Sequence, residues 1–272
     1  GLMAAFPTVT STLTYCYVAD GYCMALLFAV LSAMLIDEDG KKHLIAGGAL
    51  LTLTLGIYQA YISVTILLLL IKLIERLIFD GETAKDSLQR AGRFLVCGVS
   101  AGVLYLIIVF LSLKITNTPL SDYLGLDSNS SSFNLLYLPR VLYHCAKTFE
   151  GFFFNLENGI SLYAVLNAVM LCALIWLIIC AAKRGGLFKS HSRTLLIVYS
   201  VAAPICASPL YFISPGTAYH NLMTMGFYAF YLFFVLFYER LGDAPERFVK
   251  RKNWGILLLS AAMLFNFTLI SN

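Results

Sequence analysis

The sequence predicts an all-α protein, a polytopic transmembrane helix bundle that forms a single domain over residues 1–272 with about eight membrane segments. Three observations predict this class. The chain is 60% hydrophobic and only 12% charged, whereas a soluble domain has roughly 25% charged residues. Its mean hydropathy of +0.80 indicates more apolar surface than a soluble core can bury. The apolar residues also form charge-free runs that approach the roughly 20 residues needed to cross a bilayer.

The first two apolar runs predict three helices. Gly21–Ile36 is free of charge and ends at an acidic and basic loop. The next charge-free run, Leu44–Ile71, is too long for one span, and Gly56–Tyr61 (GIYQAY) is the natural place to break it. We therefore expect helices at about 43–57 and 59–79. Short or interrupted spans often line a cavity, because non-helical backbone is tolerated in a membrane only there.

The second half of the chain alternates between polar loops and spans. The polar connector 80–93 is interpreted as a short amphipathic loop before a span at 94–113. A long polar interruption, 114–158, follows. Pro204 and Pro209 should kink or loosen the span that contains them, because proline lacks the helical donor and clashes with the preceding turn. The remaining expected spans are 159–182, 194–213, 222–238 and 254–271.

The basic residues indicate how this bundle is oriented. Of the 19 Lys and Arg residues, all but Lys114, Arg140 and Lys147 fall in or beside loops on one side of the expected topology. Positive charges are retained on the cytoplasmic side. The pattern predicts a multi-pass membrane protein, with the lipid bilayer as a partner and residues 114–158 on the outer face. The net charge of +4 is therefore explained by membrane orientation, and no nucleic-acid partner is expected.

The long loop contains a predicted interfacial amphipathic helix within residues 133–155. If the part after Pro139 is helical, the spacing of Arg140, His144 and Lys147 places them within about 60° of one another on a greasy helix. Such a stripe is typical of a helix lying in the membrane interface. One interpretation is that the stripe binds the phosphate of an anionic lipid-linked substrate. The other is that its cations extend to ordinary lipid headgroups.

Three acidic residues on the expected outer face are candidates for acid–base chemistry. Asp20 lies at the mouth of the first span, where a carboxylate is costly to desolvate and is often functional. It is a candidate general base or sugar-positioning group, and the alternative is a helix cap. Glu150 and Glu157 are further candidates, and the alternative for both is a solvated loop charge.

Polar and aromatic residues near the same face are candidates for binding a sugar or a phosphate. Tyr58, Gln59 and Tyr61 at the helix break have the groups to hydrogen-bond and stack on a sugar ring, and the alternative is an aromatic belt at the interface. His220, beside Tyr219, is a candidate phosphate ligand or proton shuttle, and the alternative is an ordinary loop histidine.

Nothing in the sequence indicates a cofactor. The seven cysteines show neither CxxC nor Cys/His ligand spacing, so neither a zinc site nor a disulfide framework is predicted. A requirement for a divalent cation is left open, because no sequence pattern indicates one. No nucleotide-binding glycine loop or hydrolase signature is present.

Two stretches carry a family resemblance: TYCYVADGYCMALLFAVLSAMLI at 14–36 and LTLTLGIYQAYISVTILLLL at 51–70. They resemble the Gtr-type O-antigen glucosyltransferases of serotype conversion, which look like members of the GT-C class of membrane glycosyltransferases. The resemblance is specific at Gly56–Ala60 and in the order of the spans. Beyond about residue 115 it extends only to the general layout.

The resemblance implies a hexosyltransferase that acts in lipopolysaccharide modification. The implied donor is a polyprenyl-phosphate sugar, typically undecaprenyl-phosphate glucose, and the implied acceptor is a lipid-linked glycan such as O-antigen on the periplasmic face. It favours Asp20, Tyr58 and Gln59 as site residues. The family also carries acidic residues in a first outer loop, which should lie upstream of Gly1, so the chain is expected to be N-terminally incomplete.

Two other functions fit the same layout. An O-antigen polymerase or ligase would share the long outer loop and its basic residues, and would differ by building chains in place of adding one sugar. A transporter or flippase of lipid-linked sugar would be expected to show inverted repeats and ionisable residues deep within its spans, whereas the central parts of these spans carry no charge.

Overall fold

The computed structural model describes residues 7–15, 17–118, 137–156, 159–187, 192–212, 217 and 219–242. Every regular element within these residues is a helix, so the predicted all-α class is confirmed. The elements, with η marking a 3-10 helix, are α1 (Pro7–Thr14), α2 (Ala19–Asp37), α3 (Lys41–Ile57), η2 (Gln59–Tyr61), α4 (Ile62–Phe79), α5 (Ala84–Thr116), α6 (Leu138–Phe153), α7 (Leu162–Arg184), α8 (Ser192–Cys206), η7 (Pro209–Phe212), η8 (Asn221–Phe227) and α9 (Tyr228–Gly242).

Four helices in the described part of the chain are long and apolar enough to cross a membrane: Ala19–Asp37, Ala84–Thr116, Leu162–Arg184 and Asn221–Leu241. The expected spans at 43–57, 59–79 and 194–213 also form helices, but α3 and α8 are shorter, and the last turns of α4 contain Lys72, Glu75 and Arg76. The expected span at 254–271 lies outside the described residues. The count of about eight membrane segments therefore stays a prediction.

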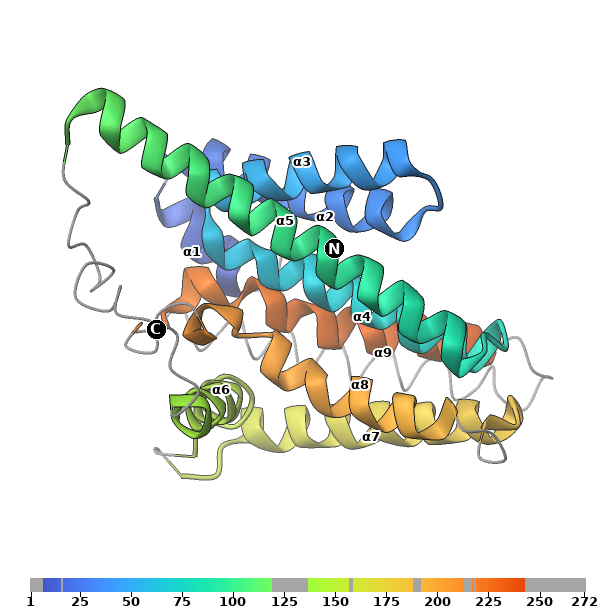
Figure 1. Cartoon of the computed structure of the whole chain (residues 1–272). Helices are drawn as coiled ribbons and strands as arrows, with labels where there is room; N and C mark the ends of the chain where they lie inside the picture. The colour runs from blue at the N-terminus through green and yellow to red at the C-terminus, as the bar shows by residue number, and fades with distance from the viewer. Residues whose placement is uncertain are drawn as a thin grey trace.

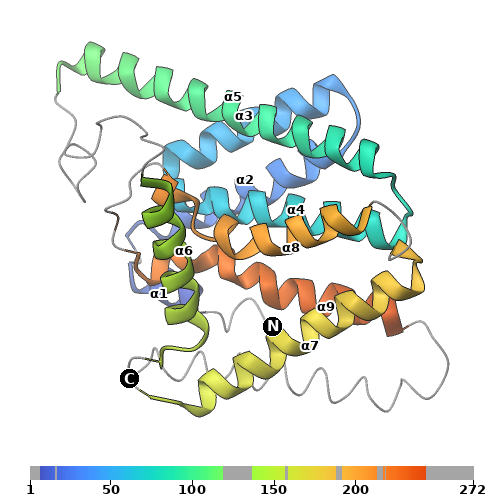
Figure 2. The ribbon, with the colours of Figure 1, turned by 60° about the horizontal axis from the view of Figure 1, so that its bottom comes forward.

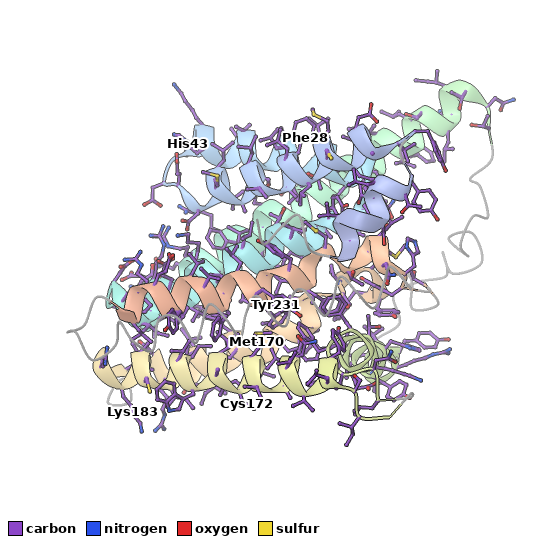
Figure 3. All side chains as sticks on the ribbon, turned by 180° about the vertical axis from the view of Figure 1, so that it is seen from behind. Phe28, His43, Met170, Cys172, Lys183 and Tyr231 are labelled. Atoms are coloured by element: carbon purple, nitrogen blue, oxygen red, sulfur yellow. The ribbon has the colours of Figure 1, made fainter. Side chains whose placement is uncertain are left out.

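Helix α4 occupies the centre of the bundle (Figures 1 and 2). It contacts α2 and α5 on one side and α7, α8 and α9 on the other. Its Leu67, Ile74 and Leu77 are at most 2% exposed. In Figure 3, Met170 of α7 and Tyr231 of α9 lie in the interior, and both are almost fully buried. Within a bilayer, such side chains stabilise the bundle through close van der Waals packing between helices.

The break predicted at Gly56–Tyr61 is confirmed. Helix α3 ends at Ile57, and Tyr58 takes an extended conformation with φ −153° and ψ 102°. The Tyr58 amide donates to the carbonyl of Thr54 at 2.8 Å, which closes the last turn of α3. The short η2 then leads directly into α4. Similarly, the two prolines loosen the span that contains them: α8 ends at Cys206, and η7 begins at Pro209.

The predicted loop at 80–93 is wrong over most of its length, because α5 begins at Ala84 and continues without interruption to Thr116. The Thr83 hydroxyl accepts from the Asp86 amide at 3.2 Å and caps the helix. Asp86 also places a negative charge in the first turn, where the helix dipole favours it. The polar first turns of α5 are thus stable as helix.

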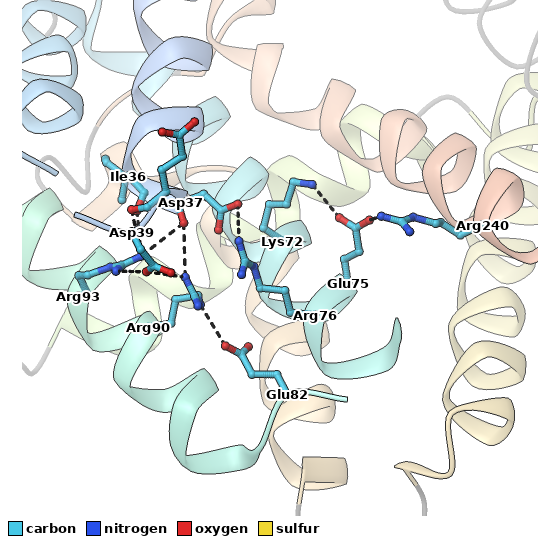
Figure 4. A network of polar contacts seen from close by, with 11 residues as sticks. Ile36, Asp37, Asp39, Lys72, Glu75, Arg76, Glu82, Arg90, Arg93 and Arg240 are labelled. Atoms are coloured by element: carbon cyan, nitrogen blue, oxygen red, sulfur yellow. Dashed lines mark hydrogen bonds and ion pairs between the residues drawn. The ribbon is translucent and has the colours of Figure 1, made fainter. Parts of the chain in front are cut away.

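Ion pairs fasten one end of the bundle (Figure 4). They join the last residues of α2, the end of α4, the start of α5 and the end of α9, and several of the side chains are largely shielded from solvent. The pairs are Arg76–Asp37 (2.9 Å), Arg90–Glu82 (3.0 Å), Arg93–Asp39 (2.7 Å), Lys72–Glu75 (2.9 Å) and Arg240–Glu75 (2.6 Å). Figure 3 places His43 and Lys183 at this end too. We call it the ion-paired end.

The opposite end is built differently. It gathers α1, the N-terminus of α2, η2, η7 and η8, and α6 lies across it with its axis crossing those of α7 and α8 (Figures 1 and 2). The basic residues predict that successive loops alternate between the two ends of the bundle. Which end faces the cytoplasm stays a prediction.

Candidate functional site

We call the end of the bundle opposite the ion pairs the aromatic end. Helix α1 lies at this end. The Thr8 hydroxyl donates to the carbonyl of Asn221 at 2.9 Å and lies 2.8 Å from the Thr224 hydroxyl. Both Thr8 and Thr224 are buried. The N-terminal lead-in, for which the sequence indicated no helix, is therefore packed against η8.

The first aromatic group surrounds the helix break. The ring of Tyr58 packs edge-on against Tyr22, with centroids 4.8 Å apart, and against Tyr61, with centroids 4.9 Å apart. Tyr58 is half-buried, but Tyr61 is only 2% exposed. Of the two predicted sugar-binding tyrosines, only Tyr58 is thus partly exposed, and the buried Tyr61 packs against its ring.

Gln59 connects the break to α5. Its side-chain amide donates through Nε2 to the hydroxyl of Tyr105. Both side chains are partly buried. This bond fixes the short η2 against the long helix, and it determines where the Gln59 amide points.

The second aromatic group links α6 to the turn after α8. The His144 ring stacks on Tyr211, with centroids 5.4 Å apart and an interplanar angle of 23°. Tyr211 in turn packs on Tyr219, with centroids 4.7 Å apart. The Tyr211 hydroxyl lies 2.8 Å from that of Thr148, and the Tyr219 hydroxyl accepts from the Leu210 amide at 3.4 Å.

A small apolar cluster joins the two aromatic groups. Ala60, Leu210 and Met223 are buried together, and both Tyr58 and Tyr219 pack against them. Residues predicted from separate parts of the sequence, at the helix break and before η8, therefore adjoin one another.

The basic side chains of α6 lie beside the second group. The condition for the predicted stripe is met, because α6 is helical from Leu138 to Phe153. Arg140 and Lys147 are exposed. Arg140 Nε donates to His144 Nε2 at 3.4 Å, and among the described residues it has no carboxylate partner. The cations of the ion-paired end in Figure 4 are, by contrast, neutralised by Asp or Glu.

The predicted acidic residues differ in their exposure and in their hydrogen bonds. Asp20 is exposed in the first turn of α2, and its Oδ1 accepts from the Gly21 amide at 2.9 Å. The N-cap position itself is occupied by Val18. Glu150 is half-buried near the end of α6, where Oε1 accepts from the Leu156 amide at 3.0 Å and holds the following turn. Glu157 lies outside the described residues.

His220 is the N-cap residue of η8, and its carbonyl accepts from the Met223 amide at 2.8 Å. Its ring is at the surface, yet the neighbouring chain desolvates it enough to lower the pKa of the imidazole. Partial desolvation disfavours the charged form, so the neutral imidazole is favoured.

Three site residues were missed by sequence reasoning. Tyr22 and Tyr211 pack directly on predicted residues, and Tyr105 accepts the Gln59 bond. The signal was weak: a tyrosine hydroxyl within a long apolar run at 105, and an aromatic pair after Pro209. In the described part of the chain, no three His, Cys, Asp or Glu side chains are grouped as metal ligands.

A comparison with known protein families gives a match. A family model described as "Glucosyl transferase GtrII" matches residues 1–238. The chain belongs to this family. The match confirms the resemblance carried by residues 14–36 and 51–70, and it extends well beyond residue 115. No curated protein and no solved structure matches the chain.

Membership of the GtrII family, together with the four apolar helices, makes this protein a membrane glycosyltransferase. Such an enzyme must bind a sugar donor and an acceptor. The aromatic end has groups suited to both a sugar and a phosphate: half-buried tyrosine at the break, an amide, and arginine beside histidine.

Proposed function

We propose that this GtrII-family protein transfers glucose from a polyprenyl-phosphate donor to a lipid-linked glycan such as O-antigen, at the aromatic end of the bundle and on the periplasmic face of a bacterial inner membrane. The observation that carries the proposal is the position of Arg140. It lies on the helix that crosses this end, beside the stack of His144 on Tyr211, with no carboxylate partner among the described residues.

Arg140 is suited to bind the phosphate that links sugar and lipid. A guanidinium group holds phosphate oxygens through short charge-assisted hydrogen bonds. Charge of the departing lipid phosphate grows as the bond to the sugar breaks, so a preplaced cation lowers the barrier. Lys147 extends the positive surface along α6, His144 accepts the bond from Arg140 and holds its guanidinium beside the Tyr211 ring, and His220 is the further candidate near the phosphate.

Tyr58 and Gln59 are suited to bind the glucose. The half-buried Tyr58 ring, held edge-on by Tyr22 and Tyr61, offers a rigid apolar surface for stacking, while its hydroxyl is buried. Gln59 has its Nε2 committed to Tyr105, which orients its carbonyl oxygen for a sugar hydroxyl. Rigid groups bind with less loss of conformational freedom.

The chemistry requires a base for the acceptor. The acceptor hydroxyl attacks the anomeric carbon, the bond from that carbon to the phosphate oxygen breaks, and the polyprenyl phosphate leaves with the electron pair. The hydroxyl proton passes to a carboxylate. Asp20 is the exposed carboxylate in the first turn of α2, two residues before Tyr22 of the first aromatic group, and Glu150 is the second candidate.

Purified protein in detergent tests the proposal with labelled donor. We expect transfer from undecaprenyl-phosphate glucose and none from a nucleotide sugar alone. Arg140→Ala should raise the KM for the donor by about tenfold or more, since losing a charge-assisted bond costs about 1.5–3 kcal/mol, and it should also lower kcat because the leaving phosphate loses its cation. Lys183→Ala, at the ion-paired end, is the matched control. Transfer from the nucleotide sugar, or an unchanged kcat/KM for the donor in Arg140→Ala, would contradict the proposal.

A further inference from the structure

A groove of about 500 Å³ lies between the C-terminal half of α3 and the C-terminal half of α5. Its walls include Thr52, Leu53 and Gly56 of α3 and Tyr105, Ile108 and Ser112 of α5. This volume falls in the range of roughly 300–1,000 Å³ that is usual for sites of small ligands. The groove adjoins the aromatic end, with which it shares Tyr105.

The lining of the groove is more apolar than its composition indicates. Thr52 donates its hydroxyl to the carbonyls of Gly48 and Ala101, at 3.0 and 3.4 Å. Thr116 likewise donates to the carbonyl of Ser112 at 2.8 Å. Because these hydroxyl groups are satisfied by backbone carbonyls, a hydrocarbon occupant meets less unsatisfied polarity at Thr52 and Thr116.

The position of the groove relates it to the donor. Tyr105 lines the groove and also accepts the hydrogen bond from Gln59, which adjoins Tyr58. The hydrogen-bonded pair of Gln59 and Tyr105 thus connects the groove to the candidate sugar site. On its outer side α5 exposes Leu104 and Ile107, 46% and 50% exposed, so this helix faces the hydrocarbon of the bilayer.

We propose that the groove binds the first isoprene units of the polyprenyl-phosphate donor. The proposal rests on the function proposed above, and it adds a position for the lipid part. A chain entering from the bilayer would lie between α3 and α5 and reach the aromatic end beside Gln59, where the sugar would meet Tyr58 and the phosphate would turn toward Arg140 of α6. The groove would then select for an isoprenoid lipid through the contacts of its walls.

Gly56 offers a direct way to fill the groove. A Cβ atom placed there meets no other atom within 4 Å, so a side chain can begin at this wall of the groove without a clash at its Cβ. Gly98 of α5 has the same open surroundings and does not line the groove. Gly56→Trp and Gly98→Trp are therefore matched variants.

The test compares undecaprenyl-phosphate glucose with methyl-phosphate glucose, a short donor that has no isoprene unit. The unmodified protein and Gly98→Trp should show a lower KM for the long donor. Gly56→Trp should raise the KM of the long donor by about tenfold, equivalent to about 1.4 kcal/mol, and leave that of the short donor nearly unchanged. An intact preference for the long chain in Gly56→Trp would overturn the inference.

A second measurement needs no variant. The unmodified protein is irradiated with an undecaprenyl phosphate that carries a photoreactive group on its first isoprene units, and the adducts are mapped by mass spectrometry. We expect adducts on α3 and α5 that excess undecaprenyl phosphate suppresses. Adducts suppressed equally by phospholipid would identify a bilayer lipid as the occupant and overturn the inference. Absence of transfer from either donor in unmodified protein would instead refute the proposed function.

Discussion

The His144 ring stacks on the ring of Tyr211, with centroids 5.4 Å apart and planes inclined by 23°. This contact joins α6 to η7, two elements far apart in the chain. It is reinforced one turn further along α6, where the Thr148 and Tyr211 hydroxyls lie 2.8 Å apart. Tyr211 therefore sets the position of α6, and with it the position of Arg140.

Substitutions at Tyr211 should separate positioning from stability. Tyr211→Phe keeps the stack and loses only the bond to Thr148, so it should cost about 0.5–1.5 kcal/mol of unfolding free energy with little change in activity. Tyr211→Ala removes the ring on which His144 rests, and it should raise the donor KM to the same extent as Arg140→Ala. Thermal unfolding and donor KM, measured together, check this. Equal donor KM values for Tyr211→Ala and Tyr211→Phe would refute a positioning role.

Replacement of Asp20 tests the candidate base. If its carboxylate takes the acceptor proton, Asp20→Asn should lower kcat by about 10²–10⁴-fold with a nearly constant donor KM. Asn retains a carbonyl oxygen that accepts from the Gly21 amide, so the helix start is preserved. A loss of thermal stability at constant kcat would show that Asp20 acts only in the first turn of α2. Glu150→Gln, measured alongside, tests the second candidate.

Gly226 should tolerate no side chain. A Cβ atom there would lie 2.6 Å from the Ser63 hydroxyl oxygen and 3.3 Å from the carbonyl of Ala207. Gly226→Ala should therefore cost about 1–3 kcal/mol, the usual effect of overpacking. Gly98→Ala is the control, because its Cβ meets nothing within 4 Å and alanine favours a helix. Chemical denaturation in detergent gives both values, and equal stability of the two variants would contradict the close approach of η8 to α4.

Acid should weaken the ion-paired end. The hydrogen bond from Arg93 and the charge of Arg90 lower the pKa of Asp39. A carboxyl group with a lowered folded pKa stabilises the fold above its unfolded pKa of about 3.9, and this contribution is lost as pH falls through the folded value. We expect Tm to fall below pH of about 4, and to fall less in Asp39→Asn. Because Asp39 is largely exposed, the difference should be small. If Tm falls equally with pH in the unmodified protein and in Asp39→Asn, protonation of Asp39 does not contribute to the acid destabilisation.

Local features of the sequence were sufficient to predict most of the helices. Charge-free runs indicated α2, α3, α4 and α7, because the cost of burying charge in hydrocarbon acts residue by residue. The glycine-containing break at Gly56–Tyr61 and the proline-loosened end of α8 were also predicted, since Gly and Pro act through the backbone of their own turn. The start of α5 was missed although Thr83 and Asp86 form a local helix-start signal, and the ion pair of Arg93 with the distant Asp39, which also holds these polar turns, has no local sequence pattern.

The sequence by itself determined the helical class, the break and the family to which the chain belongs, because hydrophobic runs and short motifs are written in neighbouring residues. Only the tertiary structure decided that Tyr58 and Tyr219 pack on one cluster, that α6 rests on Tyr211, and that α3 and α5 leave a groove beside Gln59. These relationships depend on how helices cross, and helix crossing is set by side-chain packing between segments that no local pattern connects.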